Sequence, residues 1–249
     1  MPQKLKYSIV IPAYNEERVI GSTIDKTVEF FRKQKGTFEI IIANDGSKDE
    51  TSKIVLEKIK KYKELRLYSN EVNQGRGAVL SNAFRNAKGE ILVYIDADLA
   101  IDINLFPRLI NAIEEKNVDI AIGSKHLKES EVEYPKIRRL FSKAYFMCAK
   151  LLLGTSVKDY QCGFKAFKRD VLLKILPYVH SKGWTWDTET IVKSIWAGYK
   201  VAELPAKVVN VYGRESKVNL LKDVKTMGKG LLRLRREKKE FLKNFYSKT

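Results

Sequence analysis

Two carboxylates with a spacing suited to metal binding follow an apolar run of the sequence. Asp96 and Asp98 come directly after residues 91–95, ILVYI. Side chains two residues apart in an extended segment point to the same side, so the two carboxylates would repel each other unless a cation lies between them. Mg²⁺ or Mn²⁺ takes one or two protein carboxylates and completes its coordination with substrate phosphates. The pair therefore predicts a metal site at Asp96 and Asp98 that neutralises a nucleotide diphosphate.

Polar residues also follow two other apolar runs. PAYNEE, at residues 12–17, comes after the run at 7–11, and NDGSKD, at residues 44–49, comes after the run at 38–43. Taken singly, such residues are ordinary in turns and at helix N-caps. Because acidic segments follow all three runs, we interpret them as parts of one functional site and not as separate turns.

The elements that must position these residues alternate in type along the first half of the chain. Short apolar runs predict strands at residues 7–11, 38–43, 65–68, 91–95 and 120–122. Amphipathic stretches between them predict helices at residues 19–31, 51–62, 78–87 and 105–113. This alternation is typical of an α/β fold with a mostly parallel sheet and helices on both faces. Ligands of such folds bind beyond the carboxyl ends of the strands, where the acidic segments stand.

The second half is less regular and strongly basic. A basic amphipathic helix is expected at residues 137–153, followed by a region of mixed pattern. The apolar stripe of this helix fits either core packing or contact with a membrane surface. A basic amphipathic helix is also expected in the last residues of the chain, either docked on the domain or lying on an anionic leaflet.

The composition indicates a globular protein with an anionic partner. The 249 residues include 47 Lys and Arg against 30 Asp and Glu, for a formal net charge of +17. Nucleic acid, a phosphate-rich ligand or a membrane surface would each suit that charge. Two cysteines exclude a disulfide scaffold and a four-cysteine zinc site. The N-terminus has no signal-peptide pattern and no run approaches the roughly 18 apolar residues of a span, so a cytoplasmic location is expected.

A glycine-rich segment opens the third predicted helix. NQGRGAV, at residues 73–79, contains a Gly-x-Gly but lacks the Gly-Lys-Ser/Thr of a phosphate-binding Walker loop. It also lacks the third glycine of the dinucleotide pattern, because Leu80 stands there. The segment is therefore weak evidence for phosphate binding, and a flexible turn into a helix explains it as well.

Six motifs together resemble a known enzyme family. PAYNEE, NDGSKD, NQGRGAV, DADLA, GSK and DYQCGFK, in this order and spacing, resemble the GT-A glycosyltransferases of family 2. They are most similar to the branch that transfers sugars to a polyprenyl phosphate, which contains dolichyl-phosphate mannose synthase and dolichyl-phosphate glucosyltransferase. The resemblance covers residues 7–215. It implies a glycosyltransferase domain at 1–215, with a nucleotide-sugar-binding half at 1–125 and an acceptor half at 126–215, and a basic helical extension at 216–249.

The resemblance also implies which residues bind the nucleotide sugar. The nucleoside would be lined by Pro12, Ala13, Tyr14 and Glu16. Asp45 would contact the base or the ribose, and Asp96 and Ala97 would contact the nucleotide sugar. Asp98 would hold the metal, with Asp96 beside it.

Basic residues complete the donor side by the same resemblance. Lys125, in the GSK motif, would approach the phosphates, and Arg214 and Lys217 belong to a segment that closes over the diphosphate in relatives. The mannose-synthase pattern has Gln two residues beyond the second Asp, where this chain has Ala100. DYQCGFK is also closer to the glucosyltransferase branch, so UDP-glucose is the first choice of donor and GDP-mannose the second.

The chemical class of the acceptor depends on which group attacks the sugar. A sugar hydroxyl needs a base to take its proton, whereas a lipid phosphate is already anionic near neutral pH. Cations are available on the helix expected at 137–153, where Arg138 and Ser142 share one face and Arg139 lies in a neighbouring row. In the family, the Arg and Ser that match Arg138 and Ser142 contact the acceptor phosphate. These residues are therefore the expected acceptor-phosphate site.

The sequence thus predicts an inverting, metal-dependent hexosyltransferase that uses polyprenyl (dolichyl) phosphate, with Asp98, Arg138 and Asp187 as catalytic residues. A peripheral position on the cytoplasmic face of the membrane is expected, with a membrane protein as a possible partner. One alternative is a saccharide or protein hydroxyl acceptor, with Asp187 or Glu189 as the base. An acid near the start of a helix, stabilised by the helix dipole, explains both residues equally well. A nucleic-acid-binding protein is a remote alternative, because base-stacking and groove-reading motifs are absent.

Overall fold

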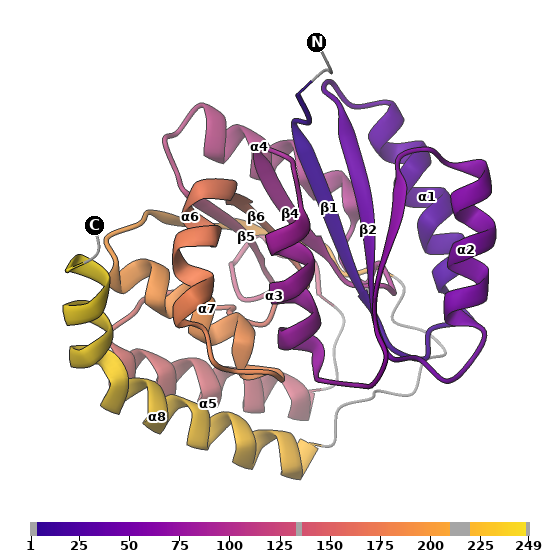
Figure 1. Ribbon diagram of the computed structural model, residues 1–249. Helices are drawn as coiled ribbons and strands as arrows, with labels where there is room; N and C mark the ends of the chain where they lie inside the picture. The colour runs from indigo at the N-terminus through magenta and orange to yellow at the C-terminus, as the bar shows by residue number, and fades with distance from the viewer. Residues whose placement is uncertain (1–3, 133–135, 210–219, 248–249) are drawn as a thin grey trace.

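A seven-stranded sheet runs through the centre of the molecule in the order β3-β2-β1-β4-β6-β5-β7 (Figure 1). The strands are β1 Tyr7–Ala13, β2 Phe38–Asp45, β3 Leu65–Asn70, β4 Ile91–Ile95, β5 Ile120–Ser124, β6 Phe164–Lys168 and β7 Val201–Pro205. Strand β6 is antiparallel to both of its neighbours, β4 and β5, and the other adjacent pairs are parallel. The predicted mostly parallel α/β sheet is confirmed.

The computed structural model describes the backbone of residues 4–132, 136–209 and 220–247. Side chains are described for residues 4–132, 142–209 and 226–247.

Helices cover both faces of the sheet, as expected. They are α1 Ile20–Arg32, α2 Thr51–Lys61, α3 Arg76–Asn86, α4 Phe106–Glu114, α5 Lys136–Leu153, α6 Arg169–Ile175, α7 Thr185–Trp196 and α8 Leu220–Tyr246, with short 3-10 turns at Ile103–Leu105 and Leu176–Tyr178. Helices α1, α2 and α4 lie on one face. Helices α3, α6 and α7 lie on the other, and α5 and α8 run side by side next to them (Figure 1).

The central strands are apolar throughout because each face of the sheet has its own core. In β1, Ile9 belongs to the core under α1 and α4, and Val10 belongs to the core under α3 and α7. Successive side chains of a strand point to opposite faces, so a strand covered on both sides needs apolar residues at every position. The rings of Phe31 and Phe106 meet edge to face in the first core, with centroids 4.6 Å apart.

Helix α8 docks on the domain, which the sequence left open. Among its described side chains, Leu231, Leu234, Phe241 and Phe245 are buried. The helix packs against α5 and α7, and Phe241 and Phe245 contact Tyr178 in the 3-10 turn that follows α6. The spacing of these buried residues places them on one side of the helix. Within the described part of the chain, no helix combines the length and the apolarity required to cross a bilayer.

Strand β6 brings the second half of the chain into the functional edge. It enters the sheet between β4 and β5, and its register pairs Lys165 with Tyr94 and Phe164 with Ile95. Because β6 is antiparallel, its beginning meets the carboxyl end of β4. The segment before β6 therefore lies beside Asp96, where the backbone N–H of Asp96 donates to the carbonyl of Gly163 at 3.0 Å.

Candidate functional site

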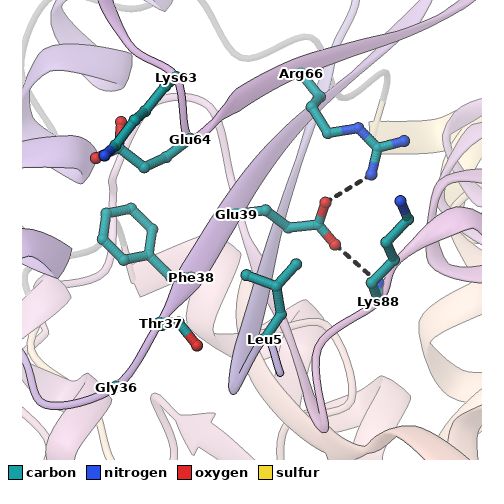
Figure 2. A pocket seen from close by; sticks show the side chains of 9 residues that line it. All are labelled: Leu5, Gly36, Thr37, Phe38, Glu39, Lys63, Glu64, Arg66 and Lys88. Atoms are coloured by element: carbon teal, nitrogen blue, oxygen red, sulfur yellow. Dashed lines mark hydrogen bonds and ion pairs between the residues drawn. The ribbon is translucent and has the colours of Figure 1, made fainter. Parts of the chain in front are cut away.

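The pocket drawn in Figure 2 lies at the edge of the sheet opposite to the motif-bearing loops. It has a volume of about 530 Å³ and lies at the amino ends of β2 and β3. Its Glu39 carboxylate accepts hydrogen bonds from Arg66, at 2.6 Å, and from the backbone N–H of Lys88, at 2.8 Å (Figure 2). The pocket's other acid, Glu64, pairs with Arg32 at 3.0 Å. Both carboxylates are therefore satisfied by the protein itself, whereas the motif residues lie at the carboxyl edge of the sheet.

The loops that follow β1 and β2 are tied into one wall at the carboxyl edge. The backbone N–H of Asn15 donates to Ser47 Oγ at 3.0 Å, and that of Glu16 donates to Thr51 Oγ1 at 2.8 Å. Tyr14 stands on this wall with 39% of its surface exposed. The wall thus carries the predicted nucleoside residues of PAYNEE next to NDGSKD.

The two residues that end β1 belong to the sheet itself. Pro12 pairs with Ala43 and Ala13 with Asn44 in the parallel ladder of β1 and β2. Ala13 is buried, whereas Pro12 is partly exposed. These positions join the wall to the sheet, and their contact with a nucleoside stays a prediction.

Asp45 orders the segment that leads into α3. Its Oδ1 accepts from Asn70 Nδ2 at 2.8 Å and from the backbone N–H of Gln74 at 2.9 Å, and its Oδ2 accepts from the N–H of Gly75 at 2.8 Å. The residue is buried, with 2% of its surface exposed. The predicted contact with the base or ribose stays a prediction, and the structure adds this loop-ordering role.

Asp96 is held from three directions. Its Oδ1 accepts hydrogen bonds from the hydroxyl of Tyr94 and, at 3.4 Å, from Arg76. A Cβ atom at Gly163 would lie 1.6 Å from Asp96 Oδ2, so only glycine fits there. Gly163, in the DYQCGFK motif, therefore packs directly against Asp96 in the DADLA motif.

Asp98 fits a divalent metal better than Asp96 does. Its carboxylate is partly exposed, and its Oδ1 accepts from the N–H of Ala100 at 3.1 Å, which fixes its orientation. Among the described residues, no cluster of three or more His, Cys, Asp or Glu is placed to hold a metal. A hard carboxylate without a complete protein cage suits Mg²⁺ or Mn²⁺, which takes its other ligands from substrate phosphates and water.

A buried ion network lies directly beneath the DADLA motif. Asp187 is fully buried and accepts from Arg76 at 2.5 Å and from Lys165 at 2.6 Å. The guanidinium of Arg76 lies over the rings of Tyr94, 5.0 Å from the centroid, and Trp184, at 4.8 Å. Through Arg76 and Asp187, the network links α3, β4, β6 and α7.

The glycines of NQGRGAV make room for protein and not for phosphate. The N–H of Gly77 donates to the carbonyl of Lys182 at 2.7 Å. A Cβ at Gly75 would lie 2.4 Å from that same oxygen, and a Cβ at Gly77 would lie 2.5 Å from the Cβ of Trp186. Gly75 also has a φ of +101°, which favours glycine. The first turn of α3 is therefore packed against residues 181–186.

Asp187 and Glu189 are both neutralised by cations. Burial raises the pKa of Asp187, but the charges of Arg76 and Lys165 outweigh it and hold that pKa below its ordinary value. Burial likewise raises the pKa of Glu189, and Lys193 outweighs burial and lowers it. Carboxylates with lowered pKa values inside ion pairs are weak bases.

The residues that follow β5 connect the predicted donor side, at Lys125, to the predicted acceptor side, at Ser142. The backbone N–H of Lys125 donates to Asp159 Oδ2 at 2.9 Å, and its Nζ lies 3.4 Å from the same oxygen. His126 Nε2 and Ser142 Oγ are hydrogen-bonded at 2.6 Å, which ties α5 to the end of β5. The structure thereby brings Lys125 and Ser142 to neighbouring positions.

Several predicted residues fall outside the described parts of the structure. Arg138 and Arg139 lie in α5, but their side chains are outside the described residues. Arg214 and Lys217 are outside them altogether. The residue from which that segment continues, Val209, donates its N–H to the carbonyl of Ala100 at 2.8 Å.

Cys162 is unsuited to nucleophilic catalysis. It is fully buried, and burial raises the pKa of its thiol to about 12. A thiol with that pKa is protonated at neutral pH and is a poor nucleophile.

Sequence reasoning missed Arg76, Lys165 and His126 as residues of this region. Arg76 lies inside a motif that was weighed only for its glycines. Lys165 is a charged residue in a strand that is otherwise largely apolar, which was the available signal because buried lysines are paired. His126 follows the GSK motif directly.

Comparison with known proteins adds relatives that match most of the chain. The model of Glycosyl transferase family 2 matches residues 8–176. The glycosyltransferase AglD of Haloferax volcanii is 36% identical over 92% of this chain and 37% of its own length. The dolichyl-phosphate beta-glucosyltransferase ALG5A of Trichomonas vaginalis is 32% identical (88% of this chain, 70% of its own), and that of Saccharomyces cerevisiae is 31% identical (94% and 75%). The chain thus spans 37% of the length of AglD.

Solved structures share the fold at low sequence identity. Glucosyl-3-phosphoglycerate synthase from Mycobacterium tuberculosis, in complex with Mn²⁺, UDP and glucosyl-3-phosphoglycerate, has a TM-score of 0.65 at 20% identity, over 93% of this chain and 80% of that one. Mannosyl-3-phosphoglycerate synthase from Rubrobacter xylanophilus has a TM-score of 0.70 at 20% identity, over 95% and 75%.

Proposed function

The chain belongs to glycosyl transferase family 2, in the dolichyl-phosphate glycosyltransferase branch, and from this premise we propose that it transfers glucose from UDP-glucose to a polyprenyl (dolichyl) phosphate with inversion. The names of the relatives from Trichomonas vaginalis and Saccharomyces cerevisiae support glucose and dolichyl phosphate. The synthase crystallised with UDP and Mn²⁺ supports a uridine nucleotide and a divalent metal.

One observation carries the choice of acceptor. A hydroxyl acceptor would need a base, for which Asp187 and Glu189 are the candidates. Both carboxylates are buried in ion pairs and have lowered pKa values. A phosphate acceptor needs no base, because its nucleophilic oxygen is already ionised near neutral pH. The geometry of the described residues therefore favours phosphate over a hydroxyl.

The proposed reaction places the donor on the wall formed after β1 and β2. Pro12, Ala13, Tyr14, Glu16 and Asp45 line the nucleoside. Asp96 and Ala97 contact the nucleotide sugar. Asp98 would hold Mg²⁺ or Mn²⁺, with Asp96 beside it, and the ion when bound supplies positive charge that neutralises the diphosphate. Lys125, with Arg214 and Lys217, adds positive charge near the phosphates.

The acceptor approaches from α5, where Arg138, Arg139 and Ser142 bind its phosphate. An oxygen of that phosphate attacks the anomeric carbon of glucose. The new carbon–oxygen bond forms on the face opposite to the leaving group, and the bond between the anomeric carbon and the β-phosphate oxygen breaks. UDP leaves with the electron pair of the broken bond, so the configuration at the anomeric carbon is inverted.

We expect UDP with Mn²⁺ to raise the melting temperature of the protein by roughly 5–10 °C at a concentration of about 100 times its Kd, because binding to the native state alone stabilises it. GDP with Mn²⁺ should raise it less. Differential scanning fluorimetry checks this, with EDTA in place of Mn²⁺ as the control. A larger shift with GDP would point instead to GDP-mannose as the donor.

Arg138→Ala should raise the KM for a short polyprenyl phosphate by on the order of 10-fold or more, because a lost charged contact costs about 1.5–3 kcal/mol. The thermal shift given by UDP and Mn²⁺ should stay as in the wild type. Arg85→Ala, which removes an exposed arginine from the last turn of α3, is the matched control. Equal losses of acceptor use and donor binding would contradict the acceptor role.

The surface of α5 and α8 suits peripheral contact with an anionic leaflet. Leu151 is 81% exposed and Met147 59% exposed on α5, next to the exposed Lys143 and Lys150. Each basic side chain near such a surface contributes about 1 kcal/mol of attraction. We place the protein on the cytoplasmic face of the membrane through this surface, with a membrane protein as a further partner.

A further inference from the structure

One arginine of the C-terminal helix reaches into the domain beneath the site. Arg233 of α8 donates to Ser181 Oγ at 2.7 Å and to Glu189 Oε2 at 2.6 Å. Glu189 is fully buried and also accepts from the backbone N–H groups of His180, at 3.1 Å, and Ser181, at 2.9 Å. The Arg233–Glu189 pair therefore holds residues 180–181 by three hydrogen bonds, two to their backbone and one to the Ser181 side chain.

The segment held by this pair, residues 180–182, is hydrogen-bonded to the first turn of α3. The next carbonyl, that of Lys182, accepts from the N–H of Gly77 at 2.7 Å and from that of Ala78 at 3.3 Å. The absence of a Cβ at Gly75 and Gly77 allows this close approach. The position of residues 180–182 thus determines where α3 begins, and Arg76 is the first residue of α3.

Arg76 then connects this segment to the DADLA motif. Trp184 covers its guanidinium at 4.8 Å, Asp187 accepts from it, and it donates to Asp96 at 3.4 Å. The contacts form a continuous chain from Arg233, through residues 180–184, to Arg76 and Asp96. Each link is a hydrogen bond, a ring contact or the backbone that joins residues 180–184.

A second contact fixes the height of α8 above this segment. A Cβ at Gly230 would lie 2.5 Å from Thr185 Cγ2 and 3.0 Å from its Oγ1. Thr185 is buried and β-branched, so it has little freedom to move away. In contrast, a Cβ at Gly228, two residues earlier, would meet nothing within 4 Å.

We propose that Arg233 and Glu189 are positioning residues, through which helix α8 sets the placement of Arg76, Trp184 and Asp96 at the donor site. The chain beyond the family 2 match is then part of the machinery that shapes the site. The effect on catalysis rests on the proposed function, whereas the effect on the geometry of Trp184 does not.

Tryptophan fluorescence gives a readout that needs no substrate. The chain has three tryptophans, of which Trp184 is 37% exposed, Trp196 9% and Trp186 0%. Quenching by acrylamide therefore reports mainly on Trp184. Arg233→Ala should raise the quenching constant about 2-fold, because residues 180–184 lose their anchor and Trp184 leaves Arg76. Lys243→Ala, which removes an exposed charge from the same helix, should leave it unchanged.

The Arg233→Ala variant should still fold, since Glu189 keeps Lys193 as a cation at 2.6 Å. Arg233→Lys should restore part of the wild-type quenching, because one charged donor remains. An unchanged quenching constant in a folded Arg233→Ala protein would overturn the proposal.

The two glycines supply a second, independent pair of variants. Gly230→Ala should lower the melting temperature and raise quenching of Trp184, although alanine is the better helix former. Gly228→Ala should keep or raise the melting temperature with wild-type quenching. Equal behaviour of the two variants would overturn the proposal even if Arg233→Ala fails to fold.

The kinetic consequence separates positioning from general weakening. If the wild-type protein has the proposed activity, Arg233→Ala should lower kcat by on the order of 10- to 100-fold, because misplacement of a reacting group by about 1 Å costs up to that much. The measurement is made at a temperature where the variant is folded, and the acceptor KM should be unchanged. A wild-type protein without transferase activity would refute the proposed function and leave the fluorescence result to decide this inference. An active wild-type protein whose Arg233→Ala variant keeps the wild-type kcat would contradict the positioning role of Arg233.

Discussion

Asp98→Asn should lower kcat roughly 100- to 1,000-fold while the protein keeps its fold. The divalent ion that Asp98 would hold supplies several kcal/mol of charge stabilisation to a leaving diphosphate, and each 1.36 kcal/mol corresponds to tenfold in rate. Asparagine has the same shape and can still accept the hydrogen bond that Ala100 donates to Oδ1. Turnover at saturating UDP-glucose and Mn²⁺, together with the melting temperature, measures both effects.

A matched control for this variant stands on the same loop. Asp102 accepts from the backbone N–H of Asn104 at 2.9 Å, where it caps a 3-10 turn. Asparagine caps as well as aspartate, so Asp102→Asn should keep wild-type turnover. The metal role would be refuted if Asp98→Asn retained more than about a tenth of the wild-type kcat, or if Mn²⁺ still strengthened its binding of UDP.

Asp187→Asn should destabilise the protein by about 3–5 kcal/mol, because removing one partner of a buried ion pair leaves unpaired charge in the interior. Here two cations, the partly buried Arg76 and the fully buried Lys165, would lose the carboxylate between them. For a chain of this size the melting temperature should fall by roughly 10 °C. Turnover should fall as well, since Arg76 would no longer be held beside Asp96.

The control for this prediction is an exposed acid in a helix. Asp170 lies in the first turn of α6, and Asp170→Asn should cost less than about 1 kcal/mol, the usual value of a helix-dipole contact. Similar melting temperatures for the two variants would contradict the buried network.

The pH dependence of stability provides a further check on Asp187. Its folded pKa lies below the ordinary value of 3.8. The ion pair therefore stabilises the native state above that pH, and this stabilisation is lost as the pH falls through the folded pKa. Asp187→Asn should remove this component, so the difference in unfolding free energy between wild type and variant should shrink in acid.

The first half of the fold was predictable because its signals are local. Each of the central strands is an apolar run that ends in turn-forming or acidic residues, and this pattern depends only on neighbours in the sequence. The same locality placed Asp45, Asp96 and Asp98 at one edge, since parallel strands share their carboxyl ends. The resemblance of six motifs then supplied the family, which the comparisons confirm.

Strand β6 shows why the second half was harder to predict. Its five residues, FKAFK, carry two lysines, and its antiparallel place between β4 and β5 depends on partners far along the chain. Lys165 is acceptable there only because Asp187 lies beneath the sheet edge to pair with it. The sequence contains both residues but not their proximity.

The buried network was missed for a similar reason. Arg76 and Asp187 are 111 residues apart, and each has an ordinary local explanation, as a residue of a turn and as an acid at a helix start. Only the packing of α3 against α7 brings them together. The docking of α8 on the domain likewise depended on contacts that periodicity alone does not specify.

The most direct test of the proposed function compares two acceptors that differ by one phosphate. The protein is incubated with UDP-[¹⁴C]glucose and Mn²⁺, and with either a short polyprenyl phosphate or the corresponding polyprenol, and the label in the lipid fraction is counted. We predict labelled glucolipid from the polyprenyl phosphate and none from the polyprenol. Transfer to the polyprenol, or no transfer to the phosphate from either UDP-glucose or GDP-mannose, would contradict the account.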